Sequence, residues 1–298
     1  RDSGFLQIHC ASCQEITDSV LMAYRLAEHQ HVRLPAIVNQ DGFYLSFTRE
    51  PVDLPDAEKA AAFVGAFDPE NMQFKSGAPL SQAMEVLGGG PYSYFSSEAH
   101  MALQRVLSFY DEIGEENAET FGRRYDIIDK TQLDDAEYVF VMMGSYASKA
   151  RDAVASLRQA GWTVGLARVR LFRPFPQEKF RQMLSGRRAV AVIDQNISMG
   201  MGGVLHSELA TALFGMKDAP ALLASYIGGL GGRDISQQEF FEMVDELKQA
   251  CDQGKKLEPR LLYTKNELTE IRNLQAIAQA EASEINQSEK NRSEINKK

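Results

Sequence analysis

Tyr138-Val-Phe-Val-Met-Met143 is a continuous apolar stretch that ends at Gly144-Ser145 and is followed by Ala147–Gly161, where apolar residues recur at helical spacing. This order predicts a buried strand, a tight turn and a helix. The alternation continues, with strands predicted at 163–169, 189–193 and 221–227 and helices at 176–184, 203–214 and 236–250. Strands that are buried on both faces and alternate with helices form a parallel sheet with right-handed crossovers. We therefore expect an α/β fold with a parallel α/β domain at residues 125–253.

The region upstream of this domain is less complete. Residues 14–27 predict an amphipathic helix, and Pro35-Ala-Ile-Val38 predicts a short buried strand that ends at the turn pair Asp41-Gly42. Two elements do not make a domain, so residues 1–50 are expected to be the closing part of one. Residues 51–124 begin rich in proline and end in a helical pattern, which predicts a long connection with a bridging helix.

Both ends of the chain have their own character. Residues 254–298 form a charged tail of low apolar content, expected to be partly helical or disordered. The chain begins at Arg1 without an initiator Met or a targeting pattern, so we expect the sequence to be cut from a longer chain.

Composition excludes several functional classes. The chain has 298 residues, with 32 Lys and Arg against 41 Asp and Glu, and a net charge of −9. This charge argues against nucleic acid or an acidic membrane surface as the main partner, because phosphate binding depends on clustered basic residues. No apolar run approaches the roughly 18–20 residues of a membrane helix. Three cysteines without a secretory signal predict reduced thiols and a cytoplasmic location.

Cys10-Ala-Ser-Cys13 has the spacing of a redox pair or of half a metal site. The other half is missing, since Cys251 is isolated and no second Cys pair or His pair follows the spacing of metal ligands. The alternative is a pair of small residues at a junction between a strand and a helix.

Two turns lie where the carboxyl ends of strands are expected. Gly144-Ser145 offers either an anion site at a helix N-terminus or Ser145 as the N-cap of that helix. Asp41 either faces a site after its strand or belongs to a simple turn.

Two glycine-rich segments favour ligand or partner contacts more strongly, because both follow strands at the sheet edge where open α/β sheets bind ligands. They are Met199-Gly-Met-Gly-Gly203 and Gly228-Gly-Leu-Gly-Gly-Arg233. In the second, Arg233 suits a phosphate or carboxylate, and the candidate residues are Gly228, Gly229, Gly231, Gly232 and Arg233. The alternative is plain tight turns.

An arginine and phenylalanine cluster occurs at a predicted strand exit, in Arg168-Val-Arg170-Leu-Phe-Arg173-Pro-Phe-Pro176. Arg and aromatic residues are enriched at the centres of protein interfaces, so Arg170, Arg173 and Phe175 are candidate partner contacts. The alternative is that the guanidinium groups are solvated while the phenylalanines pack under the next helix.

Several strings together resemble the alpha subunit of pyruvate:ferredoxin oxidoreductase and related 2-oxoacid:ferredoxin oxidoreductases. They occur in order from residue 1 to about residue 250 and include Arg1-Asp-Ser-Gly-Phe5, Leu34-Pro-Ala-Ile-Val-Asn-Gln-Asp-Gly-Phe43, Arg170-Leu-Phe-Arg-Pro-Phe-Pro176 and Gly228-Gly-Leu-Gly-Gly-Arg-Asp234. The resemblance does not cover the tail.

The resemblance implies an architecture. In the family, a pyrimidine-binding domain for thiamine diphosphate precedes a domain like the C-terminal domain of transketolases. Residues 1–50 then correspond to an incomplete pyrimidine-binding-type domain, and residues 125–253 to the transketolase C-terminal-like domain. The family's catalytic Glu and a Thr near the substrate have no matching position here, whereas Arg1 matches the family's arginine for the substrate carboxylate.

The resemblance also implies a reaction, in which a 2-oxoacid, most simply pyruvate, is oxidatively decarboxylated to acyl-CoA with electrons passing to ferredoxin. The complex would use thiamine diphosphate with Mg²⁺, iron–sulfur clusters and coenzyme A, none of them held by this chain alone. The implied partners are a thiamine-diphosphate-binding beta chain, a gamma chain, a ferredoxin-like chain and ferredoxin. This chain is expected to act mainly as a scaffold and to be inactive in isolation.

Three alternatives stay open. The chain could belong to another thiamine-dependent family that shares the transketolase-type C-terminal domain, or to a family member that acts on 2-oxoglutarate, branched 2-oxoacids or another small oxoacid. The chain could instead be a non-catalytic α/β module that binds an anion or a partner protein. It could also be a single folded domain after about residue 120 that carries a loosely attached N-terminal extension.

Overall fold

The computed structural model describes residues 1–69, 75–79, 90–263 and 265–295, and these residues form two compact units. The first unit is Arg1–Arg260 and the second is Leu261–Lys298. Part of the predicted connection at 51–124 and the last residues of the predicted tail lie outside the described residues.

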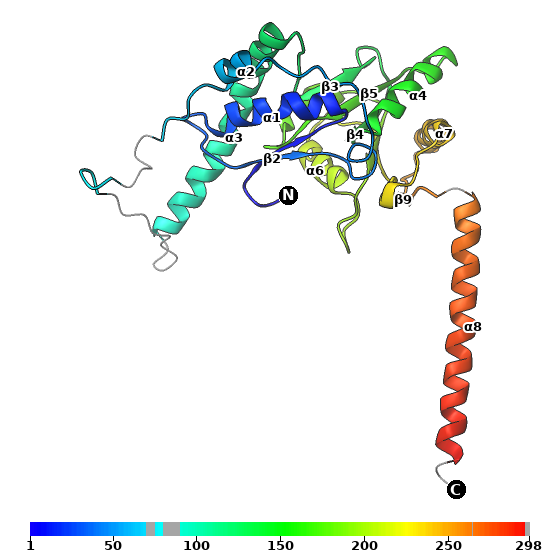
Figure 1. Ribbon diagram of the computed structural model, residues 1–298. Coiled ribbons are helices and arrows are strands. Elements are labelled where there is room, and N and C mark those ends of the chain that lie inside the picture. Colours follow the sequence, from blue (N-terminus) through cyan, green and yellow to red (C-terminus); the bar gives the residue numbers. More distant parts are fainter. Residues whose placement is uncertain (70–74, 80–89, 264, 296–298) are drawn as a thin grey trace. The chain divides into compact units, whose positions relative to one another are not determined.

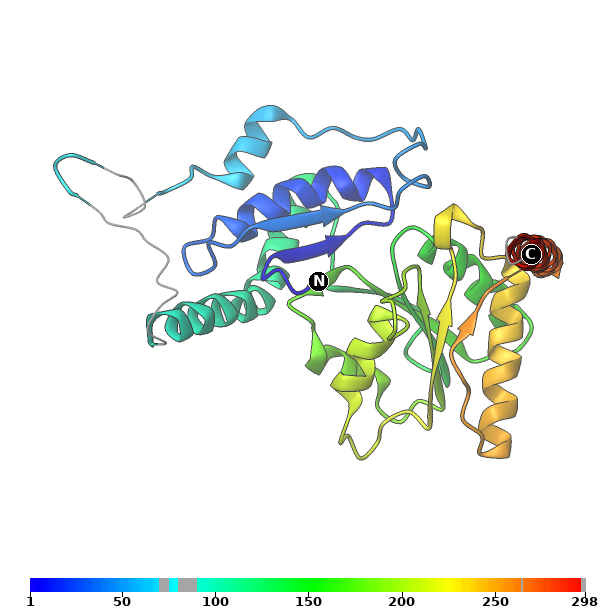
Figure 2. The same ribbon diagram turned by 90° about the horizontal axis from the view of Figure 1, so that it is seen from below.

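A three-stranded sheet is formed mainly by the start of the chain (Figures 1 and 2). Its order is β2-β1-β6, with β1 at Leu6–His9, β2 at Ala36–Asn39 and β6 at Leu171–Arg173. Strands β1 and β2 are parallel, and β6 is antiparallel to β1. Three helices accompany this sheet, which are α1 at Cys13–Ala27, α2 at Ala57–Val64 and the long α3 at Gly90–Phe121.

A six-stranded sheet follows, in the order β3-β5-β4-β7-β8-β9. Its strands are β3 at Ile128–Thr131, β4 at Tyr138–Met143, β5 at Val164–Val169, β7 at Ala189–Asp194, β8 at Leu222–Ile227 and β9 at Arg260–Leu261. Strands β5, β4, β7 and β8 are parallel, as the continuous apolar runs predict. The edge strand β3 is antiparallel to β5.

Helices cover both faces of this sheet. They are α4 at Ala147–Gln159, α5 at Gln177–Leu184, α6 at Val204–Leu213 and α7 at Gln237–Gln253. Helix α4 packs against α7, and α5 packs against α6. Ser236 caps α7 in a reciprocal capping box with Glu239, as its sequence predicts.

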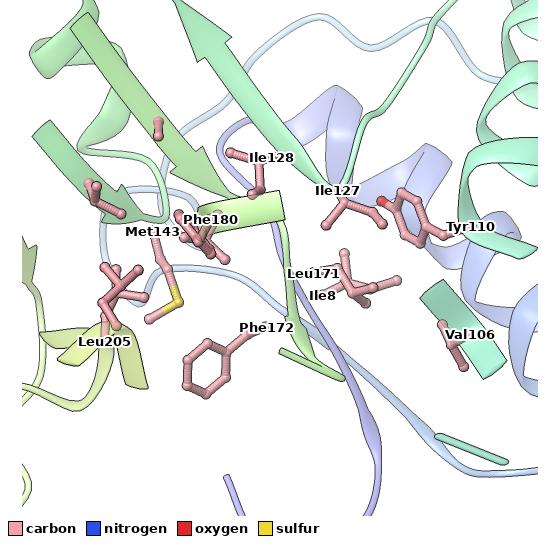
Figure 3. Packing of buried hydrophobic residues seen from close by; sticks show 14 of the residues in the cluster. Ile8, Val106, Tyr110, Ile127, Ile128, Met143, Leu171, Phe172, Phe180 and Leu205 are labelled. Carbon is pink, nitrogen blue, oxygen red and sulfur yellow. The ribbon is translucent and has the colours of Figure 1, made fainter. Parts of the chain in front are cut away.

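One core joins the two sheets. Strand β6 belongs to the second half of the chain by sequence, yet it pairs with β1 at Ile8 and Leu171. The buried cluster runs from Tyr110 and Val106 on α3 past Ile8 and Leu171 to Phe180 and Leu205 (Figure 3). The N-terminal segment is therefore an integral part of the first unit, which contradicts the alternative of a loosely attached extension.

Most elements predicted from periodicity are confirmed within about three residues, and the bridging helix predicted at the end of residues 51–124 is the long α3 at Gly90–Phe121. Four short strands, β1, β3, β6 and β9, and the helix α2 were not predicted. Each of these strands has two to four residues. Such short segments form through pairing with distant strands, so local pattern does not reveal them.

The second unit contains α8 at Lys265–Ile295. It falls in the segment that was expected to be partly helical. Four of its apolar side chains, Leu268, Leu274, Ile277 and Ile285, are exposed. No helix among the described residues is long and apolar enough to cross a membrane.

Candidate functional site

A cleft of about 390 Å³ lies at the carboxyl ends of the parallel strands. The chain runs from β4 to β5 on one side and later to β7 on the other side, so the strand order reverses between β4 and β7. Open α/β sheets bind ligands in the crevice at such a reversal. The cleft is lined by Asp41, Gly42, Phe43, Tyr44, Tyr146, Gln195, Gly229, Gly231 and Gly232.

The N-terminus of α4 is already occupied by a carboxylate from the same chain. Asp41 Oδ2 accepts hydrogen bonds from the backbone N–H and the hydroxyl of Ser145, both at 2.5 Å. Helix N-termini favour negative charge because their N–H groups and dipole point outward. The prediction that Ser145 caps α4 was wrong, because the N-cap is Tyr146 and the Ser145 hydroxyl bonds Asp41 instead.

Glycine is required where Asp41 approaches the sheet. Gly144 has a φ of 75°, and a Cβ there would lie 2.6 Å from Asp41 Oδ2 and 2.8 Å from Gln195 Oε1. A larger residue would therefore displace the loop that follows β2. The same close approach occurs at Gly203, where a Cβ would lie 2.2 Å from Asp194 Oδ2.

Aromatic rings form one side of the cleft. The ring centroids of Tyr44 and Tyr146 are 4.5 Å apart, and those of Phe43 and Tyr44 are 6.2 Å apart. Tyr146 is almost fully buried, whereas Phe43 is 63% exposed. Lys149 lies over both tyrosine rings and pairs with Asp234.

The structure brings together only part of the predicted glycine-rich segment. Gly229, Gly231 and Gly232 line the cleft, whereas Gly228 and Arg233 are not among its lining residues. Gly228 donates its N–H to the carbonyl of Asp194, and the carbonyl of Arg233 accepts from the Tyr146 hydroxyl.

Sequence reasoning missed the remaining lining residues. Asp41 was weighed, but Phe43, Tyr44, Tyr146 and Gln195 were not. Gln195 directly follows β7, so its position after a buried strand was a usable signal.

Arg170 is corrected by the structure, because it is buried rather than presented to a partner. Its Nε donates to Glu15 Oε1, and Arg168 Nη1 donates to the same oxygen at 3.0 Å. All three side chains are at most 5% exposed. The alternative of solvated guanidinium groups is equally wrong for these two arginines. The two arginines join β5 and the start of β6 to α1. They therefore stabilise contacts within the chain and not an interface with a partner.

Arg173 and Phe175 also make internal contacts. Arg173 Nη2 pairs with Glu208, and its guanidinium lies 4.4 Å from the centroid of Phe172. Phe175 is half-buried and stacks on Phe180 with centroids 5.3 Å apart. Their packing matches the alternative in which the phenylalanines lie beneath the next helix.

Arg1 lies in a different cleft from Gly229, Gly231 and Gly232, and it shares that cleft with Gly202 and Gly203 of the other glycine-rich segment. Its Nη1 is 3.4 Å from Glu208 Oε1, so Glu208 bridges Arg1 and Arg173. This second cleft has a volume of about 400 Å³ and is also lined by Met201 and His206. Arg1 is thus paired with a carboxylate of α6 in this structure.

The cysteines lie at the junction of β1 and α1, as the alternative to a redox or metal site predicts. Cys10 is buried, which raises the pKa of its thiol to about 12, and burial also raises the pKa of Cys13. All three cysteines are free. A raised thiol pKa lowers the fraction of thiolate, the nucleophilic form, at neutral pH.

Comparisons with known proteins identify the family. Residues 1–117 match the family model described as pyruvate flavodoxin/ferredoxin oxidoreductase, thiamine diP-binding, and residues 136–240 match pyruvate:ferredoxin oxidoreductase core domain II. The chain belongs to the family of 2-oxoacid:ferredoxin oxidoreductases. Its resemblance to family alpha subunits, expected from the sequence, is confirmed.

Curated relatives in this family cover most of the chain. Pyruvate synthase subunit PorA of Pyrococcus abyssi is 34% identical over 87% of this chain and 65% of the relative. The corresponding subunit of Thermotoga maritima is 38% identical over 83% and 62%. Ketoisovalerate oxidoreductase subunit VorA of P. abyssi is 34% identical over 86% and 64%. The chain thus spans somewhat less than two thirds of the length of these relatives.

A solved oxidoreductase of the same family shares the fold. It is a 2-oxoglutarate:ferredoxin oxidoreductase from Magnetococcus marinus, with a TM-score of 0.52 and 16% identity over 83% of this chain and 43% of that chain. The predicted α/β class, with a parallel sheet in its second part, is therefore confirmed.

Proposed function

We propose that this chain is part of the alpha subunit of a cytoplasmic 2-oxoacid:ferredoxin oxidoreductase that converts pyruvate, coenzyme A and oxidised ferredoxin to acetyl-CoA, CO₂ and reduced ferredoxin. The observation that carries the proposal is the ordered match of residues 1–117 and 136–240 to two domains of this family. The names of the PorA relatives favour pyruvate. The free thiols support a reducing compartment.

The role proposed for this chain is structural. The two segments that match the family models, residues 1–117 and 136–240, share one core. They are joined by the buried contacts of Glu15 with Arg168 and Arg170. A rigid unit of this kind can hold cofactor-binding domains in fixed positions, which is what catalysis by a bound cofactor requires of the protein.

The described residues of this chain contain neither the cysteine set of an iron–sulfur cluster nor a cluster of metal ligands. Three cysteines cannot supply the four thiolates of an iron–sulfur cluster. Among the residues that the structure describes, no group of three or more His, Cys, Asp or Glu has the arrangement of a metal site. The resemblance supports the proposal that thiamine diphosphate with Mg²⁺, the clusters and coenzyme A are held by the complex rather than by this chain alone, and that the complex includes a beta chain, a gamma chain and a ferredoxin-like chain.

Arg1 is proposed to contact the substrate carboxylate only because it matches the family's arginine for that carboxylate in sequence. Its guanidinium pairs with Glu208, so a 2-oxoacid would have to compete with that carboxylate. The role of Arg173 and Phe175 in assembly is a further proposal, weakened by their internal contacts.

A second substrate class is favoured by one observation, the similarity to VorA. A branched 2-oxoacid such as 2-oxoisovalerate is therefore the alternative to pyruvate.

The test is native affinity purification through this chain, followed by measurement of iron and thiamine diphosphate and by intact masses of the associated chains. We expect both cofactors and further subunits to co-purify, and ferredoxin reduction to be fastest with pyruvate in the presence of coenzyme A. Faster ferredoxin reduction with 2-oxoisovalerate or 2-oxoglutarate would show that this compound, and not pyruvate, is the preferred substrate. A colourless chain without partners would contradict the oxidoreductase proposal.

A further inference from the structure

The cleft at the strand reversal has the size and lining of a small-molecule site. Its volume of about 390 Å³ is within the range of roughly 300–1,000 Å³ found for ligand pockets. It is formed by four separate segments, which are the loop after β2, the turn after β4, the loop after β7 and the loop after β8. The loop after β2 and the glycine loop after β8 lie beside each other in both views (Figures 1 and 2).

The position that an anion would take is already filled. Asp41 Oδ2 accepts both hydrogen bonds of Ser145 and places a carboxylate at the N-terminus of α4. A phosphate or carboxylate ligand would meet this charge at close range, and like charges repel. The structure therefore argues against the anion site that the glycine-rich segment suggested.

Acceptor groups remain at the inner end of the cleft. The two hydrogen bonds from Ser145 both use Oδ2 of Asp41, and Asp41 lines the cleft, which makes its other oxygen, Oδ1, a candidate acceptor for a ligand. The amide of Gln195 lies beside it, since both Oδ1 and Gln195 Oε1 are within 2.8 Å of the position of a Cβ on Gly144. A carboxylate accepts only, whereas an amide both donates and accepts.

The aromatic side of the cleft suits a flat ring. Phe43, Tyr44 and Tyr146 form a connected set of rings, of which Phe43 is largely exposed. Gly232 lies close to Phe43, because a Cβ there would be in van der Waals contact with that ring at 3.6 Å, so the glycine loop and the ring together border the cleft. Aromatic side chains that flank such a space bind planar heterocycles by stacking.

We propose that this cleft binds an adenine-type ring through stacking on Phe43 and hydrogen bonds to Gln195 and Asp41. Glutamine pairs with adenine in a bidentate manner, accepting from the exocyclic amino group and donating to a ring nitrogen. The second N–H of the amino group then donates to Asp41 Oδ1. The inference does not depend on the oxidoreductase proposal, because it uses only the geometry of this cleft.

The test uses the full chain and compares adenosine with inosine by isothermal titration calorimetry. Inosine replaces the amino group with a carbonyl oxygen, which would face the carboxylate of Asp41. We expect saturable binding of adenosine with a Kd below about 1 mM and binding of inosine at least about tenfold weaker. Absence of saturable adenosine binding, or equal affinity for the two nucleosides, would overturn the proposal.

Variants locate the binding. Phe43→Ala removes the exposed ring and is expected to weaken adenosine binding about tenfold or more. Gln195→Leu is expected to weaken adenosine binding about tenfold, because both proposed hydrogen bonds of the amide to the ring are lost. The control is Phe214→Ala, which removes an exposed ring at the far end of α6 and should leave the Kd unchanged. Equal binding by Phe43→Ala, with a native circular dichroism spectrum, would contradict the assignment.

Binding of AMP tests whether the cleft recognises the base alone or also a phosphate group. AMP that binds as tightly as adenosine supports recognition of the base alone, as part of a nucleoside or a larger molecule. AMP that binds more than about tenfold tighter would contradict the argument that the Asp41 carboxylate excludes an anion from this cleft.

Discussion

Asp194 is a buried carboxyl group at the end of β7, and burial raises its pKa to about 6. Its two oxygens accept hydrogen bonds from the backbone N–H groups of Leu205 and His206, at 2.8 and 3.1 Å. In the unfolded chain an aspartate has a pKa of about 4. Between about pH 4 and pH 6 the unfolded chain therefore releases this proton while the folded chain keeps it.

Asp194→Asn is expected to remove this part of the pH dependence of stability. Because the folded pKa is raised, wild-type stability declines relative to the variant as pH rises from about 4 to 6, by at most about 3 kcal/mol, and the difference is constant above that window. A constant offset arises because Asn has one acceptor oxygen for two N–H donors. Urea unfolding of both proteins from pH 4 to 7 measures the free energy of unfolding at each pH. The same pH dependence of this free energy in both proteins would contradict the prediction.

At the scale of elements, α1 is held against β5 and β6 by buried charge. Glu15 accepts from Arg168 and Arg170, and its second oxygen accepts from the N–H of Ala11 at 3.1 Å. Arg168 also contacts Asp129 on β3 at 3.3 Å. Removal of one partner from such a group leaves an uncompensated buried charge.

Glu15→Gln is expected to lower the free energy of unfolding by roughly 3–5 kcal/mol, because both arginines lose their shared counter-charge. The matched control is Glu116→Gln, which removes a carboxylate 3.3 Å from Arg25 in an exposed pair. An exposed pair contributes less than about 1 kcal/mol. Chemical unfolding of the two variants compares them directly, and similar losses would show that burial of the Glu15 pairs has no special effect.

At the scale of the whole first unit, the two family segments are interlocked rather than joined end to end. Strand β6 pairs with β1, and the core is continuous between the two sheets (Figure 3). Neither segment encloses its apolar residues alone.

A chain that begins at Gly122 is therefore expected to lack the cooperative unfolding transition of the full chain. It would expose Leu171 and Phe172 to water and leave Arg168 and Arg170 without Glu15. Differential scanning calorimetry of the two chains gives the comparison. A truncated chain with the melting temperature of the parent would mean that residues 1–121 are dispensable for folding.

The candidate cleft was only partly predictable. The position of Gly229 after a buried strand pointed to the correct sheet edge, because carboxyl ends of parallel strands share that edge. The partner of Ser145 was not predictable, since Asp41 is 104 residues earlier in the chain. The aromatic side was missed for the same reason, because Phe43 and Tyr146 come from separate segments.

The sequence by itself determined the parallel sheet, its helices and the family. Apolar runs such as Tyr138–Met143 are long enough to indicate buried strands without knowledge of their neighbours. Only the tertiary structure decided where the charges lie. Arg170 follows a strand in a sequence rich in Arg and Phe, which is equally compatible with a solvent-exposed surface, a partner interface or an internal ion pair. Its burial depends on Glu15, which is 155 residues away, and contacts of that range arise from packing rather than from local pattern.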